Sequence, residues 1–435
     1  MEKYTIFWFR RDLRIFDNNG FFKALSYNEK VIPIFIFDEN ILNKLPKSDA
    51  RLEFIIQSLG TIDTALKSKR SSLGMYHGDP KAILKKLIKK WAVKRVICNE
   101  DYEPYATERD ESIKLFLAEH DISFETYKDQ VIFEKDEIVK DDGTPYRVYT
   151  PYSKKWLSNF SEASIPNYPS ENLLNRLAEI TQPKLEINNL GFDPSGIVLP
   201  TYKFNDDIIS SYEETRNFPS LDQTTRIGTH LRFGTLSVRE MVKKSYQIQN
   251  PTFLKELIWR EFFMQILWHF PHTMTRSFKP QYDLIEWRNN PSEFEKWCHG
   301  KTGYPLVDAG MRQLNQTGFM HNRVRMLVGS FLCKHLLIDW RLGEAYFAEK
   351  LFDYEMSSNV GNWQWVAGCG VDAAPYFRIF NPTEQIKKFD KKHNYIKKWV
   401  PEYQELSYPQ PIVEHKFARE RCLTTYKSAL NVQAS

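Results

Sequence analysis

The runs YTIFWF at residues 4–9 and VIPIFIF at residues 31–37 decide the fold of the first part of the chain. Both runs are short, apolar and rich in β-branched and aromatic residues, which is typical of buried strands. Three further runs of this kind lie at residues 72–76, 95–98 and 122–127. Segments of helical period, such as 50–67 and 80–91, separate the runs. This alternation predicts a doubly wound parallel sheet of five strands.

The regular alternation ends near residue 130. Up to about residue 200 the sequence is rich in Pro, Ser and Asn, as in SIPNYPSENLL at 164–174, and we interpret it as a connection between domains. Beyond residue 200 apolar residues recur at helical spacing almost throughout, for example over residues 252–269, 304–316, 324–338 and 344–352. The expected organisation is an α/β domain at 1–130, a linker at 131–200 and an all-helical domain at 201–435.

Composition limits the class of protein. With 435 residues, of which 42% are hydrophobic, the chain can bury a large core, and its net charge of +5 neither requires nor excludes a nucleic-acid groove. Five widely spaced cysteines without a CxxC pair suggest neither a disulfide framework nor a zinc site. We expect a cytoplasmic protein, because no signal-peptide pattern and no run of roughly 18 apolar residues occurs.

Motifs of several common enzyme classes are missing from the sequence. No GxGxxG follows the first strand, so the usual dinucleotide fingerprint is absent. The tripeptide at 300–302, Gly-Lys-Thr, ends like a P-loop, but Glu295 stands where that motif needs glycine. No HExxH or GxSxG occurs, and the histidines lack metal-ligand spacing, so we expect no metal site.

Aromatic residues are concentrated in the second half of the chain. Of the 11 tryptophans, 8 lie beyond residue 250. This distribution indicates a stacking surface, a cofactor pocket or an aromatic helical core. In WQW at 363–365, helical geometry directs the two indoles about 200° apart, so one could face inward while the other lines a cleft.

The segment LKELIWREFF at 254–263 has two distinct helical faces. Its apolar face consists of Leu254, Leu257, Ile258 and Phe262. Glu256, Trp259, Arg260 and Phe263 fall on another face, and two interpretations of this mixed aromatic and charged face are open. Glu256 and Arg260 can form a surface ion pair worth about 0.3–0.5 kcal/mol. Alternatively, a carboxylate beside an indole platform can bind a planar base by hydrogen bonding and stacking.

The segment MHNRVRM at 320–326 places Asn322, Arg325 and Met326 on adjacent helical faces, with Arg323 pointing elsewhere. The arginines suit phosphate or carboxylate, but ordinary solvated arginines with a buried methionine fit as well. The lysines of the segment 387–398 favour a solvated face over a nucleic-acid stripe.

Nine segments along nearly the whole chain resemble the photolyase/cryptochrome family and occur in the order typical of that family. They are FWFRRDLR, TTRIGTHLRFGTLS, ELIWREF, GKTGYPLVDAGMRQL, MHNRVRM, LLIDWRLGEAYF, NVGNWQW, DAAPYFRIFNP and PQPIVEHK. The last few are closest to bacterial class I cyclobutane pyrimidine dimer photolyases.

The resemblance implies FAD bound in the helical domain. The matching cofactor positions are Tyr212, Thr224, Thr225, Arg226, Ile227, Gly228, Arg325, Asp353, Glu355 and Asn359, with Arg325 paired to Asp353 near the flavin ring. Gly228 departs from the commoner Ser, which puts one side-chain phosphate contact in doubt, although a backbone N–H can replace it. Asn359 matches the residue that faces flavin N5, where a neutral amide tunes the reduced flavin.

The resemblance also implies light-driven repair of a flipped-out cyclobutane dimer by an electron from excited FADH⁻. Matching lesion-pocket positions are Glu256, Trp259, Asn322, Met326 and Trp365, and matching DNA-cleft positions are Arg216, Arg260, Arg323 and Arg378. Trp363, Trp340 and Trp287 match the tryptophan chain that relays electrons to resting FAD. The expected partner is UV-damaged DNA containing pyrimidine dimers, bound by a monomer.

Three rival functions are weighed against this one. Photolyases for (6-4) photoproducts carry two catalytic histidines where this chain has Asn322 and Met326, and His321 would point about 100° away. Cryptochrome photoreceptors usually carry a C-terminal extension, which we do not expect here. A flavin electron-transfer protein would leave Glu256, Trp259 and Arg323 without a role.

The identity of the antenna chromophore is a separate question. Folate-binding relatives carry an Asn-Glu pair where this chain has Tyr105 and Ala106. A deazaflavin or a flavin is therefore favoured over folate, and an empty antenna site is the further possibility.

Overall fold

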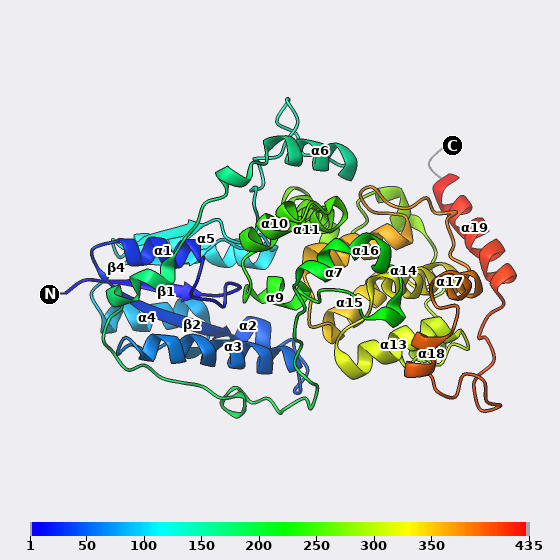
Figure 1. The fold of residues 1–435 in the computed structure, drawn as a ribbon, viewed down its shortest axis with the longest axis horizontal. Coiled ribbons are helices and arrows are strands. Elements are labelled where there is room, and N and C mark those ends of the chain that lie inside the picture. The colour runs from blue at the N-terminus through cyan, green and yellow to red at the C-terminus, as the bar shows by residue number, and fades with distance from the viewer. Residues whose placement is uncertain (1, 432–435) are drawn as a thin grey trace. The chain divides into compact units, whose positions relative to one another are not determined.

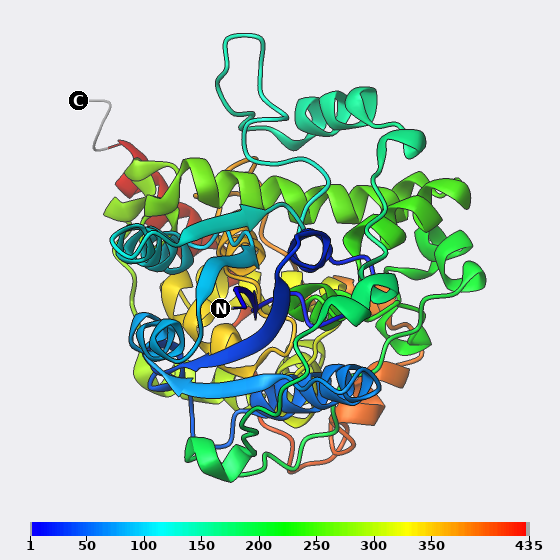
Figure 2. The same cartoon turned by 90° about the vertical axis from the view of Figure 1, so that its left-hand side faces the viewer.

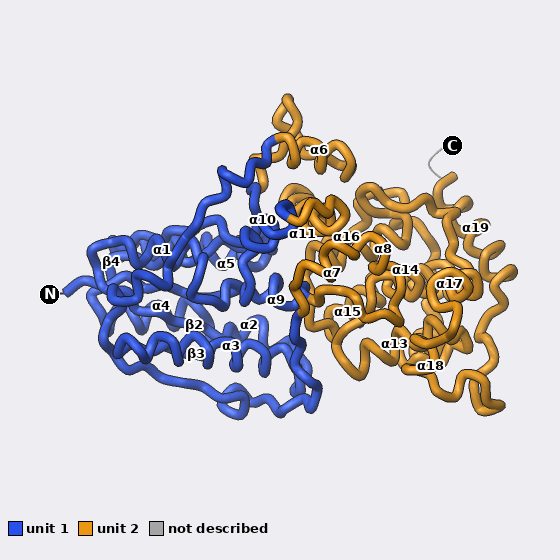
Figure 3. Tube along the Cα trace, in the orientation of Figure 1, with its two compact units in different colours: residues 1–134, 159–202, 227–247 blue, residues 135–158, 203–226, 248–435 orange. Residues whose placement is uncertain are grey.

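The computed structural model describes residues 2–431 of the chain. The contacts divide it into two compact units, shown in Figure 3. Unit 1 comprises residues 1–134, 159–202 and 227–247, and unit 2 comprises residues 135–158, 203–226 and 248–435. This grouping differs from the three consecutive regions expected from the sequence, because the chain passes between the units several times.

A parallel five-stranded sheet forms the centre of unit 1 (Figures 1 and 2). Its strands are β1 (Tyr4–Phe9), β2 (Lys30–Asp38), β3 (Gly74–Gly78), β4 (Val93–Asn99) and β5 (Ser123–Tyr127). Their order is β3-β2-β1-β4-β5, and every neighbouring pair is parallel. The predicted doubly wound sheet is confirmed.

Alternate residues of a strand point to opposite faces of the sheet. In β1 both sets are largely apolar, so both faces are covered by helices. Ile6 and Trp8 of β1 belong to an apolar cluster with residues of α4 (Pro80–Lys90) and α5 (Pro104–Ala118). Phe7 and Phe9 instead contact Phe21 of α1 (Asn19–Ser26), with ring centroids 5.0 and 5.1 Å apart. The other helices of this unit are α2 (Glu39–Leu42), α3 (Ala50–Lys67), α9 (Gly228–Phe233) and α10 (Val238–Gln247).

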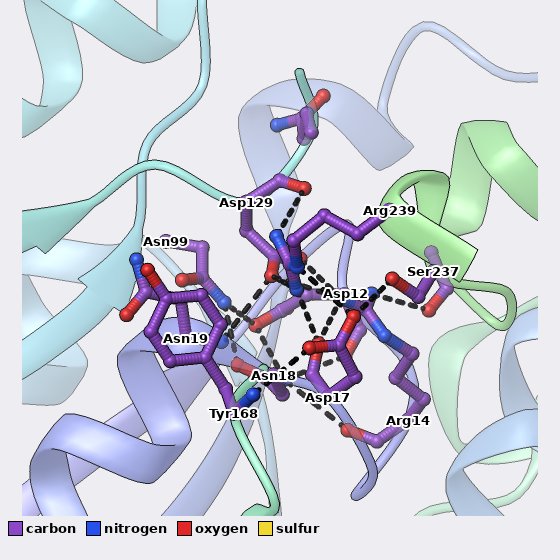
Figure 4. A network of polar contacts seen from close by, with 12 residues as sticks. Asp12, Arg14, Asp17, Asn18, Asn19, Asn99, Asp129, Tyr168, Ser237 and Arg239 are labelled. Atoms are coloured by element: carbon purple, nitrogen blue, oxygen red, sulfur yellow. Dashed lines mark hydrogen bonds and ion pairs between the residues drawn. The ribbon is translucent and has the colours of Figure 1, made fainter. Parts of the chain in front are cut away.

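A buried polar network explains why residues 227–247 group with unit 1 (Figure 4). The carboxylate of Asp129 accepts hydrogen bonds from Arg14 at 2.7 and 2.8 Å and from Arg239 at 2.8 Å. Arg239 Nε also donates to Asp17 at 2.9 Å, and the hydroxyl of Ser237 donates to the same carboxylate. Burial tends to raise the pKa of Asp129, but the two guanidiniums outweigh it and hold that pKa below its ordinary value.

Unit 2 is predominantly helical, as predicted. Its helices are α7 (Asp206–Ser210), α8 (Tyr212–Thr215), α11 (Pro251–His269), α12 (Pro291–Cys298), α13 (Pro305–Thr317), α14 (Asn322–Ser330), α15 (Trp340–Lys350), α16 (Met356–Ala367), α17 (Pro382–Phe389), α18 (Asn394–Trp399) and α19 (His415–Asn431). The region interpreted as a linker contains a further helix, α6 (Tyr149–Asn159), in which Tyr152 and Trp156 are buried. No helix within residues 2–431 is long and apolar enough to cross a membrane.

One helix predicted from Val324 to Ile338 is interrupted in the structure. Helix α14 ends at Ser330, and the π-helical turn η7 (Phe331–His335) follows it. The next helix, α15, begins at Trp340 because the side chain of Asp339 accepts the backbone N–H of Arg341. Periodicity did not indicate the interruption, since the residues of the π turn are as apolar and as buried as those of the helix before it.

Candidate active site

A pocket enclosing about 590 Å³, including its open mouth, lies in unit 2. Its lining residues are Asn322, Arg325, Met326, Gly329, Phe347, Leu351, Asp353, Tyr354, Glu355, Ser358, Asn359, Asn362, Trp363, Trp365 and Val366. Eight of these were predicted as cofactor, lesion or relay residues, namely Asn322, Arg325, Met326, Asp353, Glu355, Asn359, Trp363 and Trp365. The structure therefore brings residues with different predicted roles into one cavity.

Helical spacing places these side chains on the pocket wall. On α14, Asn322 is followed by Arg325, Met326 and Gly329 at three, four and seven residues. On α16, Ser358, Asn359, Asn362, Trp363 and Val366 follow the N-cap residue Glu355 at the same kind of spacing. Residues three and four apart share one face of a helix, so two helices supply most of the wall.

Arg325 and Asp353 form an ion pair at the pocket, as the sequence predicted. Arg325 Nη2 lies 2.8 Å from Asp353 Oδ2, and Arg325 Nε donates to the backbone oxygen of Met320 at 2.7 Å. The other carboxylate oxygen of Asp353, Oδ1, is buried and has no hydrogen-bond partner in the described part of the chain. A buried acceptor without a partner is costly, so this atom is suited to a donor from a bound ligand.

Arg226, in the predicted cofactor segment 224–228, lies beside the same aromatic ring as Arg325, that of Phe319. Arg226 lies 4.8 Å and Arg325 lies 5.7 Å from the centre of that ring. Arg226 has a left-handed backbone with φ of 56° and donates to Asp222 at 2.6 Å. Two cations thus stand beside one aromatic ring, which is suited to an anionic group.

The other predicted cofactor residues do not line the pocket. Tyr212 packs edge-on against Phe253 of α11 with ring centroids 5.0 Å apart, and the backbone oxygen of Thr225 accepts from Lys203 at 2.8 Å. Thr224, like Tyr212 and Thr225, belongs to unit 2. Ile227 and Gly228 belong to unit 1, at the N-terminus of α9.

The orientation of the Asn359 amide follows from its partners. Asn359 Nδ2 lies 3.1 Å from the backbone oxygen of Glu344 and 2.9 Å from Glu344 Oε1. A backbone oxygen only accepts, so the nitrogen of the amide must face Glu344, and the amide oxygen is left for a ligand. Burial raises the pKa of Glu344, and the hydrogen bond from Asn359 offsets part of that increase.

The mixed face of α11 makes different ion pairs from those considered in the sequence. Glu256 pairs with Arg216 at 2.5 Å, and Arg260 Nε lies 3.2 Å from Glu355 Oε2. The surface pair between Glu256 and Arg260 is therefore wrong, because each side chain finds a partner from a segment distant in sequence. Arg260 contacts the pocket wall through Glu355.

Trp259 is covered on one face by another aromatic ring. Tyr149 stacks on it with ring centroids 3.6 Å apart and planes inclined by 7°. The backbone oxygen of Lys255 accepts the hydroxyl of Tyr149 at 2.9 Å, and Asp372 accepts its backbone N–H at 3.1 Å. The half-buried indole is thereby held in a defined plane by a residue of the region that was interpreted as a linker.

Arg323 and Arg378 lie outside the pocket lining. Arg323 donates to Asn217 Oδ1 at 2.5 Å, and its guanidinium lies 4.4 Å from the ring of Phe389. Its Nη1 also contacts the sulfur of Met326, a pocket residue, at 3.7 Å. Arg378 is exposed in the segment between α16 and α17.

The three predicted relay tryptophans differ in burial. Trp363 and Trp340 are buried, whereas Trp287 is half-buried and packs edge-on against Tyr426 at 6.0 Å. Trp363 contacts Trp297 and Phe347, with ring centroids 6.2 and 5.0 Å apart. Within residues 2–431, neither Trp340 nor Trp287 makes a ring contact with Trp363.

Helix α15, which begins at Trp340, approaches Trp363 through a glycine. A Cβ atom at Gly343 would lie 2.2 Å from the Trp363 ring, so only glycine permits this packing. The ring therefore rests directly against the backbone of α15, one turn beyond Trp340.

Comparison with known proteins identifies the family to which the chain belongs. Residues 253–407 match the FAD binding domain of DNA photolyase, and residues 5–170 match the DNA photolyase family. The deoxyribodipyrimidine photo-lyase of Agrobacterium fabrum is 35% identical to the chain, and the match covers 97% of each protein. That of Escherichia coli is 34% identical, and the match covers 97% of this chain and 98% of the relative. The chain belongs to the DNA photolyase family. Its FAD-binding domain contains the pocket described above.

Solved photolyase structures share the fold of this family member along nearly its whole length. A bacterial class III photolyase from Agrobacterium tumefaciens has a TM-score of 0.86 at 33% identity, covering 99% of this chain and 98% of its own. An archaeal photolyase from Sulfolobus tokodaii with two FAD molecules has a TM-score of 0.79 at 33% identity, covering 98% and 100%. A Synechocystis cryptochrome, 24% identical, shares the fold with a TM-score of 0.83 and covers 98% and 99%.

Sequence reasoning missed several residues of this photolyase pocket. They are Gly329, Phe347, Leu351, Tyr354, Ser358, Asn362 and Val366. Those on α14 and α16 were within reach, because they continue the three- and four-residue spacing from Asn322 and Asn359. Glu344 lies within the recognised segment LLIDWRLGEAYF, but only the folded chain shows that it contacts Asn359.

Proposed function

We propose that this member of the DNA photolyase family repairs cyclobutane pyrimidine dimers in UV-damaged DNA, in a light-driven reaction with bound FAD. One observation carries the proposal. The same pocket is lined by Arg325, Asp353 and Asn359, which match flavin positions, and by Asn322 and Met326, which match lesion positions. An electron donor and its acceptor have to lie close together, and a shared cavity meets that requirement.

The residues present are suited to FAD. The unpartnered oxygen of Asp353 offers an acceptor, and the ion pair with Arg325 holds that carboxylate in place. The cationic pair of Arg226 and Arg325 around Phe319 suits a diphosphate. When bound, reduced FAD supplies the excited electron that opens the cyclobutane ring and then takes it back, so no net redox change occurs.

Asn359 supports the cofactor without changing its own charge. Its amide nitrogen is committed to Glu344, so its oxygen faces the side on which a ligand binds. A neutral amide can accept a hydrogen bond at this position while remaining un-ionised. Glu344 thus acts on the bound cofactor only through the orientation of Asn359.

Glu256 and Arg216 exchange partners when damaged DNA binds. In the free chain their ion pair at 2.5 Å occupies both side chains. The flipped dimer offers hydrogen-bonding groups to Glu256, and the phosphate backbone offers an anion to Arg216. The ion pair therefore keeps the two charged side chains paired until the lesion binds Glu256 and a phosphate binds Arg216.

The pocket favours cyclobutane dimers over (6-4) photoproducts. Asn322 and Met326 line it where a (6-4) enzyme needs histidines. The neighbouring His321 is buried, and its Nδ1 accepts the backbone N–H of Arg323 as a helix cap. Burial, together with the nearby guanidiniums of Arg325 and Arg323, lowers the pKa of His321 to about 4, so this ring is neutral near pH 7.

A repair assay tests the function directly. Reduced protein is illuminated with DNA containing either a cyclobutane dimer or a (6-4) photoproduct, and the recovery of pyrimidine absorbance is measured. We expect recovery with the cyclobutane dimer only. Recovery with the (6-4) photoproduct alone would move the chain to the other branch of the family, and recovery with neither would favour a photoreceptor role.

Replacing Trp259 by alanine should weaken binding of dimer-containing DNA by roughly ten- to a hundredfold, since base stacking on an aromatic ring contributes about 1–3 kcal/mol. Affinity for undamaged DNA should change little, because phosphate contacts supply most of it. Titration with both DNAs measures the two affinities. The matched control is Phe417→Ala, which removes an exposed aromatic ring from α19. An equal loss for damaged and undamaged DNA would contradict a stacking role.

We propose that the antenna site binds a deazaflavin or a flavin and not folate, with an empty site as the further possibility. Tyr105 donates its hydroxyl to Asp38 at 2.6 Å, and Ala106 is buried in α5, so the positions that differ from folate-binding relatives are occupied by internal contacts. The archaeal relative with two FAD molecules shows that a second flavin occurs at similar sequence identity. The absorption spectrum of the purified protein identifies the chromophore.

We further propose a cytoplasmic monomer. All five cysteines, Cys98, Cys298, Cys333, Cys369 and Cys422, are free and buried, which fits a reducing compartment. Sedimentation equilibrium of the purified protein tests the monomer, and a stable dimer at micromolar concentration would contradict it.

A further inference from the structure

Lys334 is a buried cation in the helical core of unit 2. Its side chain is 1% exposed, and it belongs to the π-helical turn η7. Its Nζ donates to the backbone oxygen of Arg378 at 2.8 Å. Among the residues that the structure describes, no carboxylate forms an ion pair with it, although buried charges are normally paired.

The groups around Lys334 do not neutralise it. They are the thiols of Cys333 in η7, Cys369 after α16 and Cys422 in α19, together with the guanidinium of Arg378. Burial raises the pKa of Cys369 and of Cys422 to about 12 and raises that of Cys333 further, so the thiols are uncharged near neutral pH. A buried charge without a counter-ion is destabilising, and a destabilising feature in a functional domain points to a function.

Lys334 donates this hydrogen bond to an irregular segment, the 370–381 loop, which lies between α16 and α17. The loop presents Phe377, 61% exposed, and the exposed side chain of Arg378. Elsewhere the loop is attached through Asp372, which accepts the backbone N–H of Tyr149 at 3.1 Å, and through Tyr376, whose ring stacks on Tyr426 with centroids 5.8 Å apart. Ile379 and Phe380 also pack against the helical core. Lys334 is the attachment at Arg378 itself.

We propose that Lys334 is a positioning residue for DNA binding, which holds the backbone of Arg378 so that the guanidinium meets a DNA phosphate in a fixed place. The inference rests on the proposed function, because it takes Arg378 as a DNA contact. A loop ordered before binding loses less conformational freedom when DNA binds, and affinity rises accordingly. An apolar side chain in η7 would pack as well, but it could not donate to the carbonyl oxygen.

If Lys334 has this role, Lys334→Met should weaken DNA binding and loosen the loop without lowering the melting temperature. Methionine has a similar length and removes the buried charge, so the melting temperature should stay the same or rise. Exchange of the backbone amides of the 370–381 loop should become faster, and the Kd for dimer-containing DNA should rise about five- to tenfold, the usual size of one lost positioned contact. FAD content should not change, because Lys334 does not line the pocket.

The experiment measures amide exchange, melting temperature, FAD content and the Kd of the purified full chain. The matched control is Lys30→Met, since Lys30 also donates to a backbone oxygen, that of Asn175 at 3.0 Å, but lies in unit 1. A fall in melting temperature with unchanged loop exchange would show an ordinary structural lysine and overturn the inference. If the methionine variant does not fold, Lys334→Leu, which also lacks a donor, is measured in the same way.

A double-mutant cycle with Arg378→Ala tests whether Lys334 acts through that arginine. If it does, Lys334→Met changes the Kd less than about twofold once Arg378 has been removed, because the two effects share one contact. Losses that multiply would overturn the inference. If the wild-type chain binds damaged DNA no better than undamaged DNA, the proposed function fails, whereas loop exchange still decides whether Lys334 holds the loop.

Discussion

Replacing Trp363 by phenylalanine should slow photoreduction of bound FAD by about a hundredfold, which corresponds to about 2.7 kcal/mol in the barrier. Phenylalanine fills most of the same space, but its ring is much harder to oxidise than indole. The side chain lines the pocket and is buried. The variant should still repair dimers once its flavin has been reduced chemically. Loss of the oxidised flavin's absorption under blue light measures the rate.

Trp399→Phe is the control for this experiment, because Trp399 lies in α18 and does not line the pocket. Normal photoreduction in Trp363→Phe would remove this residue from the relay. The same measurement in Trp340→Phe and Trp297→Phe identifies the next donor. Family resemblance indicates Trp340, whereas the ring contact in the structure is with Trp297.

Replacing Arg239 by methionine should reduce the free energy of unfolding of unit 1 by about 3–5 kcal/mol, the usual loss when one partner of a buried ion pair is removed. The change takes one guanidinium from Asp129 and removes the ion pair of Asp17. Both carboxylates stay buried, so water cannot replace the lost partner. Urea unfolding followed by circular dichroism measures the loss. The control is Arg70→Met, because the pair of Arg70 with Glu179 is exposed and should contribute little.

The effect of Arg239→Met should depend on pH. The folded pKa of Asp129 is lower than its ordinary value, so the ionised carboxylate stabilises the fold above the unfolded pKa of about 3.9. This contribution is lost as the pH falls through the folded pKa. The difference between wild type and variant should therefore be largest above about pH 5 and shrink in more acidic solution. A constant difference across this range would mean that the variant loses packing and not charge.

Much of the architecture could be predicted from local patterns. The strand at 4–9 and the helix at 50–67 were predicted with the bounds observed, because alternation and helical period depend on residues close in sequence. Arg325 and Asp353 were predicted as a pair, and the structure places them 2.8 Å apart. That prediction came from family resemblance, since 28 residues separate the two in the chain.

The interruption at η7 and the region around Tyr149 escaped prediction for a different reason. The π turn is as apolar as the helix before it, so its period carries no signal. Tyr149 lies in a stretch whose composition indicates a loop, and its function as a partner of Trp259 depends on a residue 110 positions away. The composition of a segment indicates how much apolar surface it has to bury, but it does not identify the residue against which the segment packs.

The sequence by itself determined the five-stranded sheet, the helical second half and the family, because these depend on periodicity and on motifs in a fixed order. Only the tertiary structure decided the partners. Glu256 pairs with Arg216 and not with Arg260, Arg239 joins unit 1 through Asp17 and Asp129, and Lys334 holds the carbonyl of Arg378. The physical reason is that each partner lies between 40 and 222 positions away in the chain, and the choice among so many distant polar groups is made only when the chain packs.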